Sequence, residues 1–338
     1  MATMADVARV AGVSRSTVSY VLSGTRPISD VTRERILRAM KDLNYTPNVL
    51  AQGLAGRRTG IIALIFPLSE IGFNPTEFEY IRAASEQARE DGYNLLLWPF
   101  GADEIEEVRK VVNQGLVEGV VLMEVLTTDE RVPFLIEADI PFTMIGRTAD
   151  PRDLAYVDTD FEASGSMAVD HVASLGHKEI GFLARTQADL DAGHGPAVRT
   201  RDAILAAAKK LGIRAHVFTA SPTFPAGWDA FEEIKRTAPG LTALLELNEP
   251  ATLGLMAAAA ERGVRIPQDL SIVAVNASET AAQMSKPALT SLSPSHGDMA
   301  RLAVKYLVRR LRGEDYSAFQ TLVVPELIER GSTAAAPS

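Results

Sequence analysis

The chain opens with MADVARVAGVSRSTVSYVLSG, residues 4–24, and this stretch decides how the first part of the protein folds. Thr3 and Asp6 have the spacing of a capping box, so the sequence predicts a helix that begins there. Gly12 allows the positive φ that a tight turn between helices requires, and Ser14 can cap a second helix over residues 15–22. Two helices joined by such a turn are typical of a helix-turn-helix.

A third helix follows and should close a small core. Ser29 can cap it, and it should run to Leu43 with Ile36, Leu37 and Met40 on its buried side. The second helix of such a unit fits the major groove of DNA. A generic three-helix packing module would give the same apolar pattern, so the pattern alone leaves both interpretations open.

Charge is distributed unevenly along the 338 residues. The first 60 residues carry nine Lys and Arg against four acidic residues, a net charge of +5, whereas the rest of the chain carries −14. A basic segment joined to an acidic body is expected when only one end of a protein meets nucleic acid. A solvated basic face is the alternative interpretation of the same charges.

From residue 61 on, short apolar runs alternate with amphipathic stretches. The runs are IIALIF, NLLLWPF, GVVLMEV and PFTMIG, followed by EIGFLAR, RAHVFTA, ALLELN and SIVAVN. Strands that are apolar throughout and alternate with helices indicate parallel sheets covered on both faces. This part of the chain is long for one sheet, so we expect two α/β lobes.

Composition excludes several classes of protein. The sequence has no Cys, which excludes disulfides, thiolate catalysis and Cys-based metal sites and agrees with a reducing compartment. The first ten residues include Asp6 and Arg9, so we expect no secretory signal, and the longest apolar runs fall short of a membrane span. We therefore expect a cytoplasmic protein with no membrane partner.

The residues 4–24 and the run ISDVTRERILRAMKDLNYTPNVLAQGLAG, residues 28–56, resemble the headpiece and hinge of the LacI/GalR family of transcriptional regulators. The likeness continues, less densely, through IPFTMIGR, DHVASLGHKEIGFL and IPQDLSIVAVN. It implies an all-α helix-turn-helix headpiece and a hinge. A two-lobed α/β core like that of periplasmic binding proteins should follow, with two Rossmann-like parallel sheets and a ligand cleft between them.

The implied boundaries are residues 1–46 for the headpiece, 47–59 for the hinge and 60–338 for the core. Within the core we expect a first lobe over about 60–159 and 290–318, a second over about 160–289 and 319–332, and a tail at 333–338. The tail has no heptads, so no C-terminal coiled coil is expected.

The resemblance also implies a set of DNA-binding residues, which comprises Arg15, Ser16, Thr17, Tyr20, Asn48 and Leu54. Arg15 can bind guanine O6 and N7 with two hydrogen bonds. Residues 47–56 are too short for a helix that is stable alone. In the family this segment becomes helical on the operator, and the leucine that matches Leu54 wedges into the minor groove. A plain linker is the alternative.

Ligands of open α/β sheets bind beyond the carboxyl ends of the strands, which face each other in a two-lobed core. This rule and the resemblance together select the candidate effector-binding residues Thr76, Glu77, Arg147, Asp160, Arg199, Trp228, Asn248 and Asn276. Arg201 is an alternative to Arg199, and Trp228 could stack on a sugar or pack in the core. Polar groups with an aromatic ring suit a carbohydrate, so a sugar is the expected effector.

Nothing in the sequence indicates an enzyme. The motifs GxxxxGK[ST], GxGxxG, HExxH and GxSxG are absent, and the five His residues form no close metal-ligand pair. His194 between two glycines suggests a flexible loop. We therefore expect no catalytic residue, metal or cofactor. A solute-binding receptor of the periplasmic type would share the core but has no use for a basic helix-turn-helix.

The expected protein is a homodimeric regulator, more plausibly a repressor than an activator, of a pseudo-palindromic operator in double-stranded DNA. A small-molecule effector in the cleft would control it, and on DNA it would be associated with the nucleoid.

Overall fold

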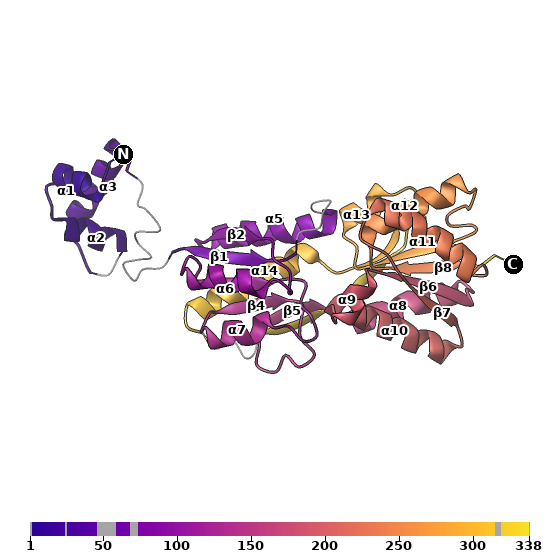
Figure 1. Cartoon of the computed structure of the whole chain (residues 1–338). Helices are drawn as coiled ribbons and strands as arrows, with labels where there is room; N and C mark the ends of the chain where they lie inside the picture. Colours follow the sequence, from indigo (N-terminus) through magenta and orange to yellow (C-terminus); the bar gives the residue numbers. More distant parts are fainter. Residues whose placement is uncertain (1, 24–25, 46–58, 68–73, 315–318, 338) are drawn as a thin grey trace. The chain divides into compact units, whose positions relative to one another are not determined.

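The computed structural model describes residues 2–23, 26–45, 59–67, 74–314 and 319–337 (Figure 1). These residues divide into two compact units. The first comprises Met1–Gly60 with Val112–Glu118, and the second comprises Ile61–Val111 with Gly119–Ser338. We describe each unit by itself.

The helical unit has the three helices that the sequence predicts: α1 (Met4–Ala11), α2 (Arg15–Ser23) and α3 (Asp30–Asp42). Thr3 and Asp6 form the capping box of α1, Gly12 follows α1 with a φ of 61°, and Ser29 caps α3. The small core consists of Val7, Ala8, Ala11, Val18, Ile36 and Ala39. Leu37 does not belong to it: the residue is 48% exposed, because the buried face of α3 runs through Ile36 and Ala39.

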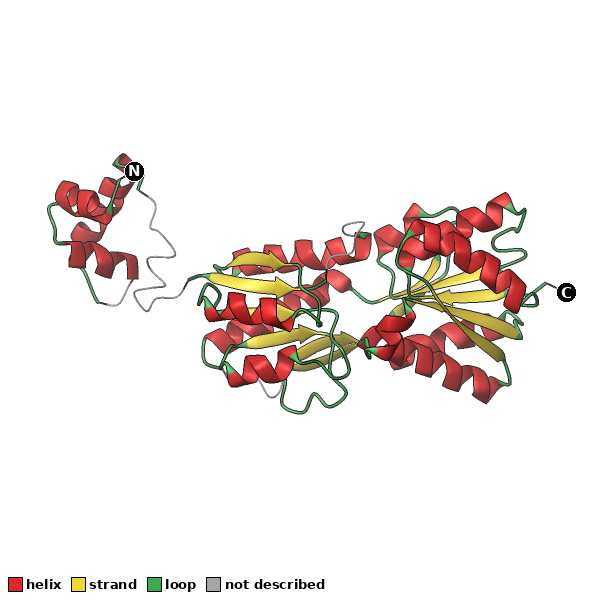
Figure 2. Cartoon of the chain, in the orientation of Figure 1, coloured by secondary structure: helices red, strands yellow, loops and turns green. Residues whose placement is uncertain are grey.

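The second unit contains two six-stranded sheets (Figure 2). The first sheet has the order β11-β5-β4-β3-β1-β2, with all pairs parallel. Its strands are β1 (Ile61–Ile65), β2 (Asn94–Trp98), β3 (Gly119–Leu122), β4 (Phe142–Ile145), β5 (Tyr156–Thr159) and β11 (Gln320–Val323). The helices of this lobe are α5 (Pro75–Glu90), α6 (Ile105–Asn113), α7 (Arg131–Glu137) and α14 (His296–Leu311).

The second sheet has the order β12-β10-β9-β8-β6-β7 and is parallel except for the edge strand β12. Its strands are β6 (Glu179–Ala184), β7 (Arg214–Thr219), β8 (Ala243–Glu246), β9 (Ser271–Val275), β10 (Thr290–Ser293) and β12 (Glu326–Ile328). The helices of this lobe are α8 (Phe161–Ser174), α9 (Gln187–Asp191), α10 (Gly195–Leu211), α11 (Phe224–Thr237), α12 (Glu249–Glu261) and α13 (Glu279–Met284).

Helices cover both faces of the second sheet, which explains why its inner strands β8 and β9 are mostly apolar and fully buried (Figure 2). Leu244 and Ile272 pack with α11 and α12 on one face, whereas their neighbours Leu245 and Val273 pack with α8 and α10 on the other. Successive strand residues point to opposite faces, so a strand buried on both sides has no polar alternation.

The chain passes between the two lobes three times, after β5, after β10 and after β11. Two of the predicted lobe boundaries are wrong. β10 pairs with β9 and so belongs to the second sheet, although residues 290–318 were expected in the first lobe. β11 pairs with β5 and belongs to the first sheet, although residues 319–332 were expected in the second lobe. Both are short strands, and each completes the backbone hydrogen bonding of a sheet before the chain crosses.

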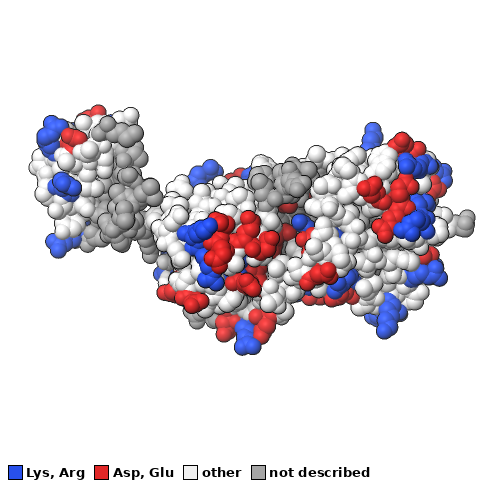
Figure 3. All heavy atoms as spheres, in the orientation of Figure 1, with Lys and Arg blue, Asp and Glu red and all other residues white. Residues whose placement is uncertain are grey.

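Charge follows the division that the sequence shows. Lys and Arg are prominent on the visible face of the helical unit, and many Asp and Glu side chains lie on the surface of the α/β unit (Figure 3). Within the described part of the chain, no helix combines the length and the apolar character needed to cross a membrane.

Candidate nucleic-acid interface and ligand cavity

The start of α2 presents polar side chains to solvent. Arg15 and Ser16 are exposed, whereas Val18 on the same helix is fully buried in the small core. The Ser14 hydroxyl oxygen accepts a hydrogen bond of 3.1 Å from the backbone N–H of Thr17 and lies 2.8 Å from its hydroxyl. The core therefore fixes α2 while its first two side chains stay free of other structural roles in the described residues.

The other candidate DNA-binding residues are placed differently. The hydroxyl groups of Thr17 and Ser14 are hydrogen-bonded to each other, so Thr17 helps to order the start of α2. Tyr20 is half-buried, and the guanidinium of Arg26 lies 4.9 Å from the centre of its ring. Asn48 and Leu54 lie outside the described residues, as does most of the predicted hinge.

A cavity of about 110 Å³ lies in the α/β unit, lined by residues from both lobes. It occupies the carboxyl ends of β3, β6, β8 and β9 and the start of α5, as expected for a two-lobed α/β core. Its polar lining includes Thr76, Glu77, Glu124, Arg185, His194, Glu246, Asn248, Glu249 and Asn276. Four of the eight predicted effector-binding residues are in this lining: Thr76, Glu77, Asn248 and Asn276.

Thr76 joins the two lobes across the cavity. Its hydroxyl donates a hydrogen bond of 3.0 Å to Glu249 Oε2 at the start of α12. The Thr76 hydroxyl oxygen itself accepts a hydrogen bond of 3.0 Å from the backbone N–H of Ser278. Thr76 belongs to the first lobe and both partners belong to the second. A ligand that competes for these groups would therefore change a contact between the lobes.

Glu77 has a structural role as well as a place in the cavity wall. Its carboxylate accepts a hydrogen bond of 3.2 Å from the backbone N–H of Asn74, while the Asn74 side chain accepts one from Glu77 N–H at 2.8 Å. This capping box holds the carboxylate at the start of α5. Burial, together with the negative charge of Glu124, raises the pKa of Glu77 to about 7.

The two predicted asparagines use their side chains within the protein. The amide of Asn248 donates to the carbonyl oxygens of Ala184, at 3.1 Å, and Ala220, at 2.8 Å. Asn248 therefore ties the ends of β6 and β7 to β8 and has no remaining donor for a ligand. Asn276 Oδ1 accepts a hydrogen bond of 3.2 Å from the Thr159 hydroxyl, which again joins the lobes.

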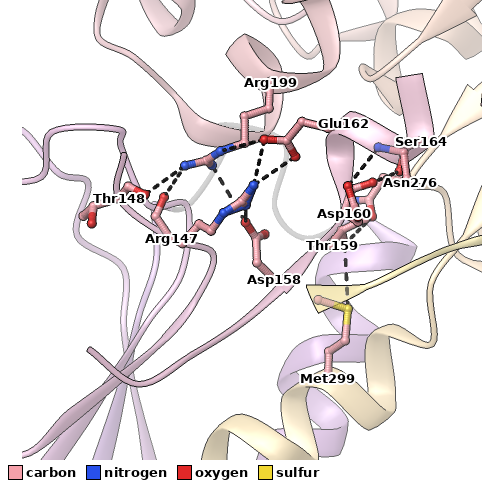
Figure 4. Close-up of polar contacts among 11 residues, drawn as sticks. Arg147, Thr148, Asp158, Thr159, Asp160, Glu162, Ser164, Arg199, Asn276 and Met299 are labelled. Carbon is pink, nitrogen blue, oxygen red and sulfur yellow. Dashed lines mark hydrogen bonds and ion pairs between the residues drawn. The ribbon is translucent and has the colours of Figure 1, made fainter. Parts of the chain in front are cut away.

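Arg147 and Arg199 are not among the residues that line this cavity. They form a network of ion pairs where β5 leads into α8 (Figure 4). Arg147 binds Asp158 at 3.1 Å and Glu162 at 2.8 Å. Arg199 donates to the carbonyl oxygens of Arg147, at 2.8 Å, and Thr148, at 3.1 Å.

This network joins the two lobes at the crossover. Arg147 and Asp158 come from the first lobe, and Glu162 and Arg199 come from the second. Burial raises the pKa of Asp158, although the charges of Arg147 and Arg199 act to lower it. Arg147 was predicted as a ligand-binding group because it follows a strand, and Arg199 because it matches the effector-binding arginine that the family resemblance implies. Carboxylates from other elements accept hydrogen bonds from Arg147, whereas Arg199 donates through Nη2 to two backbone carbonyl oxygens and lies 3.8 Å from Asp158.

Asp160 and Trp228 also lie outside the cavity lining. Asp160 caps α8 by accepting a hydrogen bond of 2.8 Å from the backbone N–H of Ala163 (Figure 4). Trp228 packs against the core beside α12, with the guanidinium of Arg262 5.7 Å from its ring, so core packing is the interpretation that fits. Arg201, the alternative to Arg199, pairs with its neighbour Asp202 and is also absent from the lining.

Glu124 and His194 also line the cavity, although neither was predicted from the sequence as a site residue. His194 is not in a free loop: it is buried directly before α10, and its Nε2 lies 2.7 Å from Glu124 Oε2. Arg185 lies 3.5 Å from the same carboxylate. Burial acts to raise the pKa of Glu124, but the charges of His194, Arg185 and Arg131 outweigh it and lower the pKa to about 2.

A signal for Glu124 existed in the sequence, because this residue follows the β3 run as Asn248 follows β8. Nothing local indicated His194, since its partner is far away in the chain. In the described residues, no group of three or more His, Asp or Glu side chains is arranged to hold a metal ion.

Comparisons with known proteins agree with both parts of the structure. Residues 3–48 match bacterial regulatory proteins of the lacI family, and residues 169–333 match a periplasmic binding protein-like domain. The chain is 30% identical over 340 residues to the HTH-type transcriptional regulator DegA of Bacillus subtilis (strain 168), which covers 98% of each protein.

Two solved structures are similar over almost the whole chain. The complex of the transcriptional regulator CelR with cellobiose is 26% identical, with a TM-score of 0.73, and the match covers 98% of this chain and 100% of that one. The lac repressor dimer bound to operator and the anti-inducer ONPF has a TM-score of 0.82 at 24% identity, with 99% of each chain covered, and shows the shared fold. These relatives are transcriptional regulators rather than enzymes. From the helix-turn-helix, the two-lobed core and these relatives, we conclude that the chain belongs to the lacI family of bacterial transcriptional regulators.

Proposed function

We propose that this protein is a repressor that binds a pseudo-palindromic operator as a homodimer and responds to a sugar in the cavity between its lobes. The observation that carries the proposal is the presentation of Arg15 and Ser16 at the exposed start of α2, on a helix anchored by buried Val18. A helix held in this way enters the major groove with its first residues at the base edges. Arg15 has the geometry to bind a guanine.

The dimer and the hinge follow from family relationships. The lac repressor relative is a dimer bound to operator. Two headpieces related by two-fold symmetry read two half-sites of a pseudo-palindrome. Asn48 and Leu54 would contact the DNA between the half-sites, with Leu54 wedged into the minor groove. The protein would act in the cytoplasm, at the nucleoid when bound to DNA.

The cavity supports the effector part of the proposal. It lies between lobes that Thr76 connects through Glu249 and Ser278, so a bound ligand would alter how the lobes meet. The relative CelR binds cellobiose, which favours a sugar. Coupling between an effector site and a DNA site is typically about 1 to 3 kcal/mol, or about 5- to 150-fold in operator affinity.

The test compares two single-residue variants of the full-length protein. An operator is first selected from a pool of random duplexes, and binding of Arg15→Ala and Arg35→Ala is then measured at one salt concentration. Arg35 is an exposed residue of α3 and serves as the control for lost charge. We expect Arg15→Ala to lose about 1 to 3 kcal/mol of preference at one base pair per half-site. Arg35→Ala should keep that preference.

Equal weakening of Arg15→Ala on all sequences would show a phosphate contact and remove Arg15 from base reading. If the selection enriches no duplex at all, the proposed function itself fails.

A further inference from the structure

The cavity between the lobes has an unusual balance of charge. Four carboxyl groups line it, opposed by one guanidinium and one imidazole; these residues are Glu77, Glu124, Glu246, Glu249, Arg185 and His194. A ligand that enters meets more acceptors than donors. The chemical class of the effector therefore depends on which of these groups are already paired within the protein.

The cationic groups of the cavity are paired. Glu124 Oε2 lies 2.7 Å from His194 Nε2 and 3.5 Å from Arg185 Nη1. Arg185 also lies 3.5 Å from Asp189, so its charge is shared between two carboxylates. An anionic ligand such as a sugar phosphate would have to displace Glu124 from both partners.

Three of the four carboxylates, those of Glu77, Glu246 and Glu249, have no cation within 4.0 Å among the described residues; Glu246 is 2% exposed, whereas Glu77 and Glu249 are half-buried. Glu77 accepts from the backbone N–H of Asn74, and Glu249 accepts from the Thr76 hydroxyl. Glu77 and Glu249 come from opposite lobes. Each lies in the first turn of a helix, α5 or α12, where the helix dipole favours the ionised form.

Burial is the main cause that raises the pKa of both Glu77 and Glu249 to about 7. Above neutral pH these groups are therefore charged and half-buried. No described cation lies within 4.0 Å of either, although the more distant charge of Arg185 acts to lower the pKa of Glu77. Burying a charged carboxylate costs free energy. A cation beside Glu77 and Glu249 would offset this cost, because an opposite charge within a few ångströms favours the ionised carboxylate.

His194 gives a second, independent indication of a ligand. Its side chain is 7% exposed, and its Nδ1 has no hydrogen-bond partner among the described residues. With Nε2–H donated to Glu124, Nδ1 is an acceptor in the neutral imidazole and an N–H donor in the imidazolium. A buried polar atom without a partner is costly in either state, and a hydroxyl group of a ligand, which can donate or accept, would satisfy it.

We propose that the effector is an amino sugar, with its ammonium group beside Glu77 and Glu249 and its hydroxyls on the remaining polar groups of the cavity. This inference rests on the proposed function, because it takes the cavity as the effector site. A neutral sugar leaves both carboxylates without a cation in direct contact. A sugar phosphate adds negative charge to a wall that already has an excess of it.

The test uses calorimetry on the full-length protein at pH 8 with matched ligands. The panel holds glucosamine, galactosamine and mannosamine, each with its neutral hexose, its N-acetylated form and the hexose 6-phosphate. We expect at least one hexosamine to bind at least tenfold more tightly than its neutral and N-acetylated forms. Because its binding at pH 7 should displace protons from Glu77 and Glu249, the measured heat should depend on the buffer's ionisation enthalpy.

Single-residue variants identify which carboxylates cause the preference for the hexosamine. Glu77→Gln and Glu249→Gln should each lower the preference for the hexosamine over its neutral form by at least tenfold. Glu90→Gln, an exposed change on the same helix as Glu77, removes the same charge and should keep the preference.

The inference is overturned if a neutral hexose or a hexose phosphate binds as tightly as every hexosamine, or if no hexosamine binds. It is also overturned if the preference survives in both glutamine variants. A neutral or phosphorylated sugar that changes operator affinity would leave the proposed function intact and reject the amino sugar alone. Failure to bind any operator would instead reject the proposed function.

Discussion

Replacement of Glu246 by Gln should change how the stability of the second lobe depends on pH. Glu246 ends β8, is 2% exposed, and accepts a hydrogen bond of 2.7 Å from the backbone N–H of Asn248. No described cation pairs with it within 4.0 Å. Burial is the largest cause that raises its pKa from 4.5 to about 7.

The expected magnitude follows from this shift. A rise from 4.5 to about 7, at about 1.4 kcal/mol per pH unit, corresponds to about 3 kcal/mol. The folded protein keeps a proton that the unfolded chain releases between these two values. The stability that this proton contributes is complete below pH 4.5 and is lost as the pH rises through 7.

The amide introduced by Glu246→Gln is neutral at every pH, so the difference in unfolding free energy between this variant and its parent should grow with pH in favour of the variant. Between pH 5.5 and pH 8.5 the growth should be about 2 kcal/mol, because part of the full effect is already present at pH 5.5. Any effect of the amide on the unfolding free energy that does not depend on pH cancels when the two pH values are compared.

Urea unfolding followed by tryptophan fluorescence is the assay. Both proteins carry Trp98→Phe, so that Trp228 on α11 reports the second lobe, which contains Glu246. Glu326→Gln, an exposed change on β12 of the same lobe, is the matched control. A difference between Glu246→Gln and its parent that stays constant with pH would refute the reasoning. An equal pH-dependent change in Glu326→Gln would refute it as well.

Two further changes test the crossover and the hinge. Arg147→Met leaves Asp158, whose side chain is 3% exposed, without its partner at 3.1 Å, and should lower the unfolding free energy by about 3 kcal/mol. The exposed pair of Arg152 and Asp150 supplies the control Arg152→Met, and equal losses in the two variants would show that the network does not stabilise the fold. Leu54→Ala should weaken operator binding and reduce DNA bending, measured by the mobility of circularly permuted fragments, while calorimetry shows unchanged effector affinity. Unchanged bending would remove Leu54 from the mechanism.

Much of the fold could be predicted because its signals are local. The capping box of Thr3 and Asp6 and the cap at Ser29 involve residues three apart, and each marks a helix start in the structure. Apolar runs that alternate with amphipathic segments likewise predict covered parallel sheets. The lobe boundaries near β10 and β11 were wrong because the sheet that a short strand joins depends on distant partners.

The candidate site was predicted in part for the same reason. The rule that ligands bind at the carboxyl ends of strands, together with the family resemblance, selected Thr76, Glu77, Asn248 and Asn276, which line the cavity. It could not show that the Asn248 amide is consumed by two carbonyl oxygens, or that Arg147 and Arg199 pair with carboxylates.

The sequence by itself determined the helix-turn-helix and the two-lobed α/β class, which follow from local spacing, periodicity and length, and its motifs indicated the family by resemblance. Only the tertiary structure decided which polar groups remain for a ligand. His194 is 70 residues from Glu124 in the chain, and Thr76 is 173 residues from Glu249. Hydrogen bonds and ion pairs form between groups that folding brings together, so their availability is a property of the folded chain rather than of any segment.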